Sequence, residues 1–202
     1  MENLEKTSSL ERPKFDAKIK KEVLNFKTGE VYQMTGGDEI VFSDKDVETI
    51  TRICSQEEIY TILFKRRLDG KPYTEENAQV FINWVKKGWE DKTYFVFIIR
   101  DGDNNVIGTI DIKSSDLESA EVGYWADRNT SGFMTNALQV LEAIAAEAGY
   151  KKLYAKVVAH NEKSMGVLER AGFVKRKESR LIEDREYNEF DVELTNDSLK
   201  KF

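Results

Sequence analysis

The sequence predicts an α/β (α+β) domain in which helices flank a mixed, mostly antiparallel central sheet. Segments 93–99, 106–112 and 118–126 have the apolar content of strands, and the turn cluster 101–105 joins the first two, which is typical of an antiparallel meander. A helical pattern over 131–148 and a strand pattern over 153–159 follow. This strand–helix–strand unit adds a parallel pair, so the sheet should be mixed.

The chain before the meander divides into two parts. Apolar residues flank Lys27-Thr28-Gly29-Glu30, which favours a hairpin turn within 23–34, and Gly36-Gly37 marks a break. We therefore expect an N-terminal extension over residues 1–37 that forms an accessory hairpin. The main domain should span 38–195, and 196–202 should form a tail.

Capping residues mark the first helices. A short strand is expected at 40–42, after which Asp44 can cap a helix with apolar residues at 47, 50 and 53 on one face. Ser55 begins a second helical piece, with Glu58 at capping-box spacing. Thr74 caps a third helix, whose first turn is acidic.

The last third of the chain alternates helices and strands. Gly149 ends the helix over 131–148 because glycine favours the helix C-cap. A strand over 153–159, a helix over 161–171 and strands over 173–180 and 185–194 complete the predicted order.

Composition narrows the class of protein. The 202 residues carry a formal net charge of −6, and 40% of them are hydrophobic, with no apolar run near the ~18 residues of a membrane helix. Residues 1–21 lack the apolar stretch of a signal peptide, and one cysteine, Cys54, excludes an intrachain disulfide. We expect a soluble cytoplasmic protein with no membrane or nucleic-acid partner and no metal. The negative charge suits a cationic partner such as an amine or a basic peptide. The alternative is that the charge only keeps the protein soluble.

The stretch from Asn129 to Thr135 opens a long helix with small and polar residues around Gly132. The first N–H groups of a helix are unpaired and lie at the positive end of its dipole, and a glycine allows close approach, so this stretch suits a pyrophosphate. An ordinary polar cap on a core helix has the same composition.

A second segment begins thirty-two residues later, at Asn161. It places Asn161 and Ser164 at the start of another helix, which ends at Ala171-Gly172 before a strand. Asn161 can be a helix cap, a cofactor contact, or both.

Together the two segments resemble the acyl-CoA-dependent N-acyltransferase superfamily (the GNAT fold), and within it the ribosomal-protein N-terminal acetyltransferases. Of the family pattern Gln/Arg-x-x-Gly-x-Gly/Ala, Gly132 matches the first glycine, whereas Asn129 and Met134 depart from it. The resemblance implies acetyl-CoA as co-substrate, bound in a gap where two parallel strands splay. The residues it implies as contacts are Tyr124, Trp125, Ala126, Asn129, Thr130, Ser131, Gly132, Phe133, Met134, Thr135, Asn161 and Ser164.

Acyl transfer to an amine needs a base, an oxyanion donor and an acid for the leaving thiolate. The resemblance implies Glu121 as the base through a water, the backbone N–H of Tyr124 or Trp125 as the oxyanion donor, and Ser164 as the acid. The Tyr that many members carry seven residues after the motif Asn is Leu168 here. The alternatives are a salt-bridged surface carboxylate at Glu121 and simple helix packing at Ser164.

The resemblance thus implies an N-acetyltransferase that moves an acetyl group from acetyl-CoA to a primary amine by direct attack in a ternary complex. The acceptor, a protein N-terminus or a small amine, would bind between 55–72 and 180–188. Six residues of these segments, or next to them, are expected to line its cleft: Tyr60, Phe64, Arg66, Arg67, Tyr73 and Tyr187. The alternatives are a non-catalytic CoA-binding or interaction module and a structural protein that uses the hairpin. Monomer and homodimer both remain open.

Overall fold

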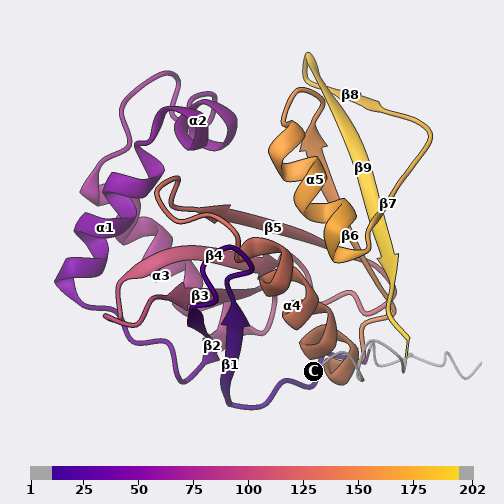
Figure 1. Cartoon of the computed structure of the whole chain (residues 1–202), viewed down its shortest axis with the longest axis horizontal. Coiled ribbons are helices and arrows are strands. Elements are labelled where there is room, and N and C mark those ends of the chain that lie inside the picture. Colours follow the sequence, from indigo (N-terminus) through magenta and orange to yellow (C-terminus); the bar gives the residue numbers. More distant parts are fainter. Residues whose placement is uncertain (1–10, 196–202) are drawn as a thin grey trace, which may run out of the picture.

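The computed structural model describes residues 11–195, so the expected tail at 196–202 lies outside the described residues. One sheet runs through it in the order β1-β2-β3-β4-β5-β6-β9-β7, and β8 pairs with β9 (Figure 1). The strands are β1 (Lys18–Leu24), β2 (Val31–Gly37), β3 (Phe95–Arg100), β4 (Val106–Ile112), β5 (Ala120–Ala126), β6 (Lys152–Val158), β7 (Val174–Lys175), β8 (Arg180–Ile182) and β9 (Arg185–Glu193). The helices are α1 (Asp44–Cys54), α2 (Glu57–Ile59), the π-helix η1 (Tyr60–Phe64), α3 (Glu75–Asp91), α4 (Met134–Ala148) and α5 (Glu162–Ala171).

The predicted fold class is confirmed. Every described strand pair is antiparallel except β5 with β6, which is parallel. The parallel pair joins the meander β3–β5 to the C-terminal strands, and α4 makes the crossover. None of the described helices is long and apolar enough to cross a membrane.

Alternation along the strands builds a core on each face of the sheet. In β3, Phe95, Phe97 and Ile99 face α4, whereas Val96 and Ile98 face α1 and α3. All of these side chains are buried, as expected for a strand that is covered on both faces.

The strand expected at 40–42 does not form; this prediction was wrong. Instead β2 pairs with β3, with Met34 opposite Ile99, so the hairpin occupies that place in the sheet. Ile40 and Phe42 pack against the core under α1 and α3. The short apolar run therefore reflects burial outside the sheet.

Two predicted boundaries also differ. Ser55 does not start a helix: it is the C-cap residue of α1, its hydroxyl donates to the Tyr73 carbonyl at 3.3 Å, and Gln56 precedes α2 instead. The strand expected over 173–180 is divided into β7 and β8. Thr74 does cap α3, with Asn77 completing a capping box.

Candidate active site

The cleft lies where the two parallel strands part. β5 and β6 pair only through Ala120 with Leu153 and Glu121 with Tyr154, although both strands run on for several residues. A cleft of about 1090 Å³ lies beside the splayed ends and is lined by β5, by the start of α4 and by the start of α5.

The free edge of β5 presents backbone groups to this gap. The Lys113 N–H donates to the Glu121 carbonyl at 2.8 Å, so the backbone of Glu121 faces β4. Because successive residues of a strand alternate in this respect, the N–H and C=O groups of Tyr124 and Ala126 face the gap. They are placed to pair with an extended ligand that carries amides.

The loop before α4 leaves the helix N-terminus open. Gly132 has φ +106°, a left-handed conformation that favours glycine, and Phe133 is the N-cap without a side-chain cap. The first helical bond runs from the Ala137 N–H to the Phe133 carbonyl (2.9 Å), so the N–H groups just before it have no partner within the helix. The first turn contains no acidic residue, which leaves these donors available to an anion.

Asp127 fixes the beginning of this loop. Its buried carboxylate accepts from the Asn129 N–H (2.9 Å), from Arg52 (2.6 Å) and from Gln56 (2.8 Å). Burial alone would raise the pKa of Asp127, but these bonds outweigh it and the pKa is lowered. The loop is therefore anchored to the end of α1 by an ionised carboxylate.

Asn161 and Ser164 meet Tyr124 across the gap. The Asn161 side-chain oxygen accepts from the Ser164 N–H at 3.2 Å, which caps α5 and leaves the amide NH₂ as a donor. The Tyr124 hydroxyl lies 2.6 Å from the Ser164 hydroxyl, and either of the two can be the donor; the Ser164 carbonyl lies 3.1 Å away as an alternative acceptor for the phenol. Burial raises the pKa of Tyr124 to about 12, so the phenol keeps its proton at neutral pH.

Glu121 lies at the closed end of the gap and does not line the cleft. Its carboxylate pairs with Lys113 (2.6 Å) and Lys156 (2.8 Å). Burial would raise the pKa of Glu121, but the two lysines outweigh it and the pKa is lowered. Because Ala120 and Val122 pack under α4, alternation puts Glu121 on the opposite face of the sheet.

The cleft brings together most of the residues that the sequence singled out. Of the expected cofactor contacts, Asn129 is the one outside its lining; those within it are Tyr124, Trp125, Ala126, Thr130, Ser131, Gly132, Phe133, Met134, Thr135, Asn161 and Ser164. The cleft is also lined by residues that the sequence did not predict there: Phe26 and Lys27 from the hairpin turn, and Glu58, Ile59, Ile62 and Leu63 from α2 and η1. No local motif marks them, because they reach the cleft through tertiary packing.

The expected acceptor residues fall into two groups. Phe64 and Tyr73 are buried with ring centroids 4.7 Å apart, and Arg67 stacks over Phe64. Tyr60 donates to the Lys71 carbonyl at 2.6 Å, and Arg66 forms an ion pair with Glu183 of the β8–β9 turn. Phe64 and Tyr73 are part of the core, Arg67 is exposed beside them, and Tyr60 and Arg66 shape the surface between η1 and the β8–β9 turn. Tyr187, the last of the set, pairs with Val158 in the ladder between β9 and β6.

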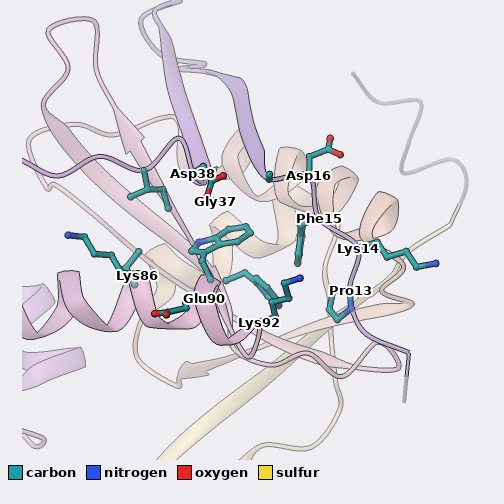
Figure 2. Close-up of a pocket in the computed structure, with 14 residues that line it drawn as sticks. Pro13, Lys14, Phe15, Asp16, Gly37, Asp38, Lys86, Glu90 and Lys92 are labelled. Atoms are coloured by element: carbon teal, nitrogen blue, oxygen red, sulfur yellow. The ribbon is translucent and has the colours of Figure 1, made fainter. Parts of the chain in front are cut away.

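A second hollow, of about 810 Å³, lies between the N-terminal segment, the end of β2 and α3 (Figure 2). Phe15 packs there against Phe95 and Trp89, with ring centroids 4.4 and 5.4 Å away. Its charged rim mixes both signs, with Lys86 and Lys92 near Glu90. Within residues 11–195, no group of three or more His, Cys, Asp or Glu is placed to hold a metal ion.

Comparisons with known proteins agree with this geometry. Two curated relatives from Bacillus subtilis (strain 168) match about half of the chain. The SPbeta prophage-derived uncharacterized N-acetyltransferase YokL is 31% identical over 104 residues (49% of this chain, 58% of the relative). The probable N-acetyltransferase YjcK is 34% identical over 110 residues (51% and 61%). The matched stretch thus spans about three fifths of each relative.

The fold is shared with a solved structure of RimJ from Mycobacterium smegmatis in complex with CoA-disulfide. The TM-score is 0.68 and the sequence identity 15%, and the match covers 86% of each chain. The family model of the acetyltransferase (GNAT) domain matches residues 41–174, which include the splayed strands and both helix starts. The chain belongs to the GNAT acetyltransferase family.

Proposed function

We propose that this protein is an N-acetyltransferase that moves an acetyl group from acetyl-CoA to a primary amine by direct attack in a ternary complex. The observation that carries the proposal is the parting of β5 and β6 after two residue pairs, with the starts of α4 and α5 on the rim of the gap. This arrangement can receive a long ligand with phosphates at one end and amides along its length.

The groups of the cleft fit acetyl-CoA part by part. The open N-terminus of α4 and Gly132 suit the pyrophosphate, because they offer unpaired N–H donors and close approach. The gap-facing C=O of Tyr124, the gap-facing backbone of Ala126 and the NH₂ of Asn161 suit the amides of the pantetheine arm. The N–H of Tyr124 is also the proposed oxyanion donor, because it faces the gap.

We assign protonation of the leaving thiolate to Ser164, with Tyr124 behind it. The two hydroxyls are 2.6 Å apart, so Ser164 can give its proton and take one from the phenol. Because the pKa of Tyr124 is raised, the phenol is protonated at neutral pH and a proton is present for this transfer.

We assign removal of the acceptor's proton to Glu121, acting through water. The pairing with Lys113 and Lys156 keeps its carboxylate ionised at neutral pH and therefore able to accept a proton. Since Glu121 lies outside the cleft, on the face opposite α4, the acceptor would approach from that face. The acceptor is proposed to be a protein N-terminus or a small amine.

Calorimetric titration with acetyl-CoA, followed by an acetylation screen over N-terminal peptides and polyamines, tests the proposal. Micromolar binding and turnover on an amine would support it. Binding without turnover on any amine would favour the alternative, a non-catalytic CoA-binding or interaction module. Absence of binding at millimolar acetyl-CoA would overturn both.

The proton relay predicts two rate effects without loss of binding. Ser164→Ala should lower kcat about 100-fold, and Tyr124→Phe, which keeps the ring, about tenfold. Both should leave the dissociation constant of acetyl-CoA within about twofold, as measured by calorimetry. Tyr150→Phe is the matched control: Tyr150 is also buried and hydrogen-bonded, to the Ser114 carbonyl at 2.7 Å, but lies outside the cleft. Full activity in both site variants would exclude the relay.

A further inference from the structure

The turn between β1 and β2 is docked onto the loop before α4. The Leu24 N–H donates to the Asn136 side chain (2.7 Å), and the Phe26 N–H donates to the Gly132 carbonyl (3.0 Å). The Lys27 ammonium donates to the Ser131 hydroxyl at 2.9 Å. Both Phe26 and Lys27 line the cleft, so residues from the N-terminal hairpin form one of its walls.

Asn25 holds this turn in a single arrangement. It is almost fully buried (1% exposed), its side-chain oxygen accepts from the Lys27 N–H at 2.9 Å, and its NH₂ donates to the Tyr32 hydroxyl at 3.0 Å. The Tyr32 ring packs edge-on against Phe133, with centroids 5.5 Å apart. The backbone of Lys27 is therefore fixed relative to the N-cap residue of α4.

The turn and the loop are fitted to one another at Gly132. A Cβ at this position would lie 2.4 Å from the Asn25 side-chain oxygen and 2.8 Å from Cγ of Lys27. The absence of a side chain at Gly132 thus allows the aliphatic part of Lys27 to lie directly over the loop. Its ammonium is held at Ser131, just before the open helix N-terminus.

The cations of the cleft differ in how far they are compensated. Arg128 and Lys163 share the carboxylate of Glu58, which offsets one of their two positive charges. Within residues 11–195, none of the ion pairs includes Lys27, whose polar partner is a neutral hydroxyl. Its positive charge remains available to an anionic ligand at the loop.

We propose that Lys27, carried by the β1–β2 turn, binds the pyrophosphate of acetyl-CoA together with the backbone N–H groups at the start of α4. This inference rests on the proposed function, since it assigns a further ligand to the same cleft. It gives the N-terminal hairpin a role in cofactor binding. A lysine suits this role because its ammonium acts as a point charge on phosphate.

Calorimetric titration of Lys27→Ala with CoA and with dephospho-CoA tests the proposal. Dephospho-CoA lacks the 3′-phosphate but keeps the pyrophosphate, so the dissociation constants of both ligands should rise by about tenfold. The loss should shrink at high salt because the interaction is ionic. Lys27→Arg should restore most of the affinity. Lys20→Ala is the matched control, because Lys20 is exposed on the same hairpin but outside the cleft.

Each outcome is decisive. Wild-type affinity in Lys27→Ala, with the wild-type protein binding CoA normally, would overturn this inference and leave the proposed function intact. A loss confined to CoA would move the contact to the 3′-phosphate and overturn the pyrophosphate assignment. Absence of CoA binding by the wild-type protein would overturn the proposed function and this inference with it. Because Lys27 is exposed, the Lys27→Ala variant should keep the melting temperature of the wild-type protein.

Discussion

Asp111 is a carboxylate whose burial makes its ionised form less stable. It lies on β4 opposite Gly123, and its Oδ1 is buried without a hydrogen-bond partner among the described residues. Burial raises the pKa of Asp111 to about 6, and the nearby Glu121 adds to the shift while Lys113 opposes it. Ionisation of Asp111 therefore costs more free energy in the folded state than in the unfolded state, although the group is still mostly ionised at neutral pH.

Asp111→Asn should stabilise the protein in a pH-dependent way. Because the folded-state pKa is raised, the protonated carboxyl favours folding below the unfolded value near 3.8, and this benefit is lost as the pH rises through about 6. Asparagine stays neutral, so the variant should gain about 2 kcal/mol at pH 8 and little at pH 4. Chemical denaturation at both pH values measures this, with Asp103→Asn in the exposed turn as control. Equal gains at both pH values would show that charge is not the cause.

At the scale of single elements, local signals predicted the structure where packing follows sequence spacing. Thr74 caps α3, Gly149 ends α4, and β4 has the boundaries expected for it, because each depends on a few neighbouring residues. Residues 40–42 were wrongly predicted as a strand because an apolar run looks the same in a sheet or in a core. Whether such a run joins the sheet depends on its pairing with strands that are distant in the sequence.

The candidate site likewise combines local features, which the sequence predicts, with contacts between distant residues, which it does not. The loop glycine and the cap of α5 at Asn161 are visible in the sequence, since they are local features. The start of α4 was predicted three residues too early, at 131 instead of Met134, because its N-cap is Phe133, which has no capping side chain. The contact of Tyr124 with Ser164 spans 40 residues, and that of Lys27 with Ser131 spans 104. No spacing rule connects such pairs, and the turn that carries Lys27 was interpreted only as an accessory hairpin.

The pair between Asp46 and Arg100 connects α1 to β3. Arg100 donates to both carboxylate oxygens of Asp46 at 2.7 and 3.1 Å, and the two side chains are 6% and 9% exposed. Asp46 also accepts from the Ser43 N–H at 2.8 Å at the start of α1. Because the Asp46 carboxylate is buried, its charge is stabilised by these hydrogen bonds from Arg100 and Ser43 in place of water.

Arg100→Leu should therefore destabilise the protein by about 3–5 kcal/mol, because it leaves Asp46 buried and charged. For a chain of this length, the melting temperature should fall by roughly 6–20 °C. Lys18→Leu, which removes an exposed pair with Glu39, is the control and should change it little. Equal melting temperatures for the two variants would contradict a structural role for the buried pair. Differential scanning calorimetry measures both.

At the scale of the whole molecule, two halves of the sheet meet in a short parallel pairing, and the cleft opens between them. Figure 1 shows α2 and α5 on opposite sides of this gap. Few contacts cross it at the open end. Lys163 of α5 reaches Glu58 of α2 at 3.1 Å, Arg66 pairs with Glu183, and Arg185 donates to the carbonyls of Ile62 and Thr61 at 3.1 and 3.3 Å.

The Arg185 contacts hold η1, one wall of the cleft, through its backbone carbonyls. η1 is a π-helix, which leaves carbonyls outside the usual bonding pattern, and the guanidinium from β9 satisfies two of them. Arg185→Ala should remove about 1 kcal/mol of local stability, given the partial exposure of these bonds. Amide hydrogen exchange over residues 57–65 should then quicken about fivefold, while that of β3 stays unchanged.

Lys177→Ala is the matched control, since Lys177 is an exposed cation in the segment before β8. If exchange over 57–65 is as slow in Arg185→Ala as in this control, the two carbonyl contacts do not hold the wall. The position of η1 would then depend on its core residues, of which Phe64 against Tyr73 is the main contact. Faster exchange would instead show that a C-terminal strand stabilises η1, an N-terminal wall of the cleft, through its backbone. The stability of this wall would then depend on both halves of the sheet.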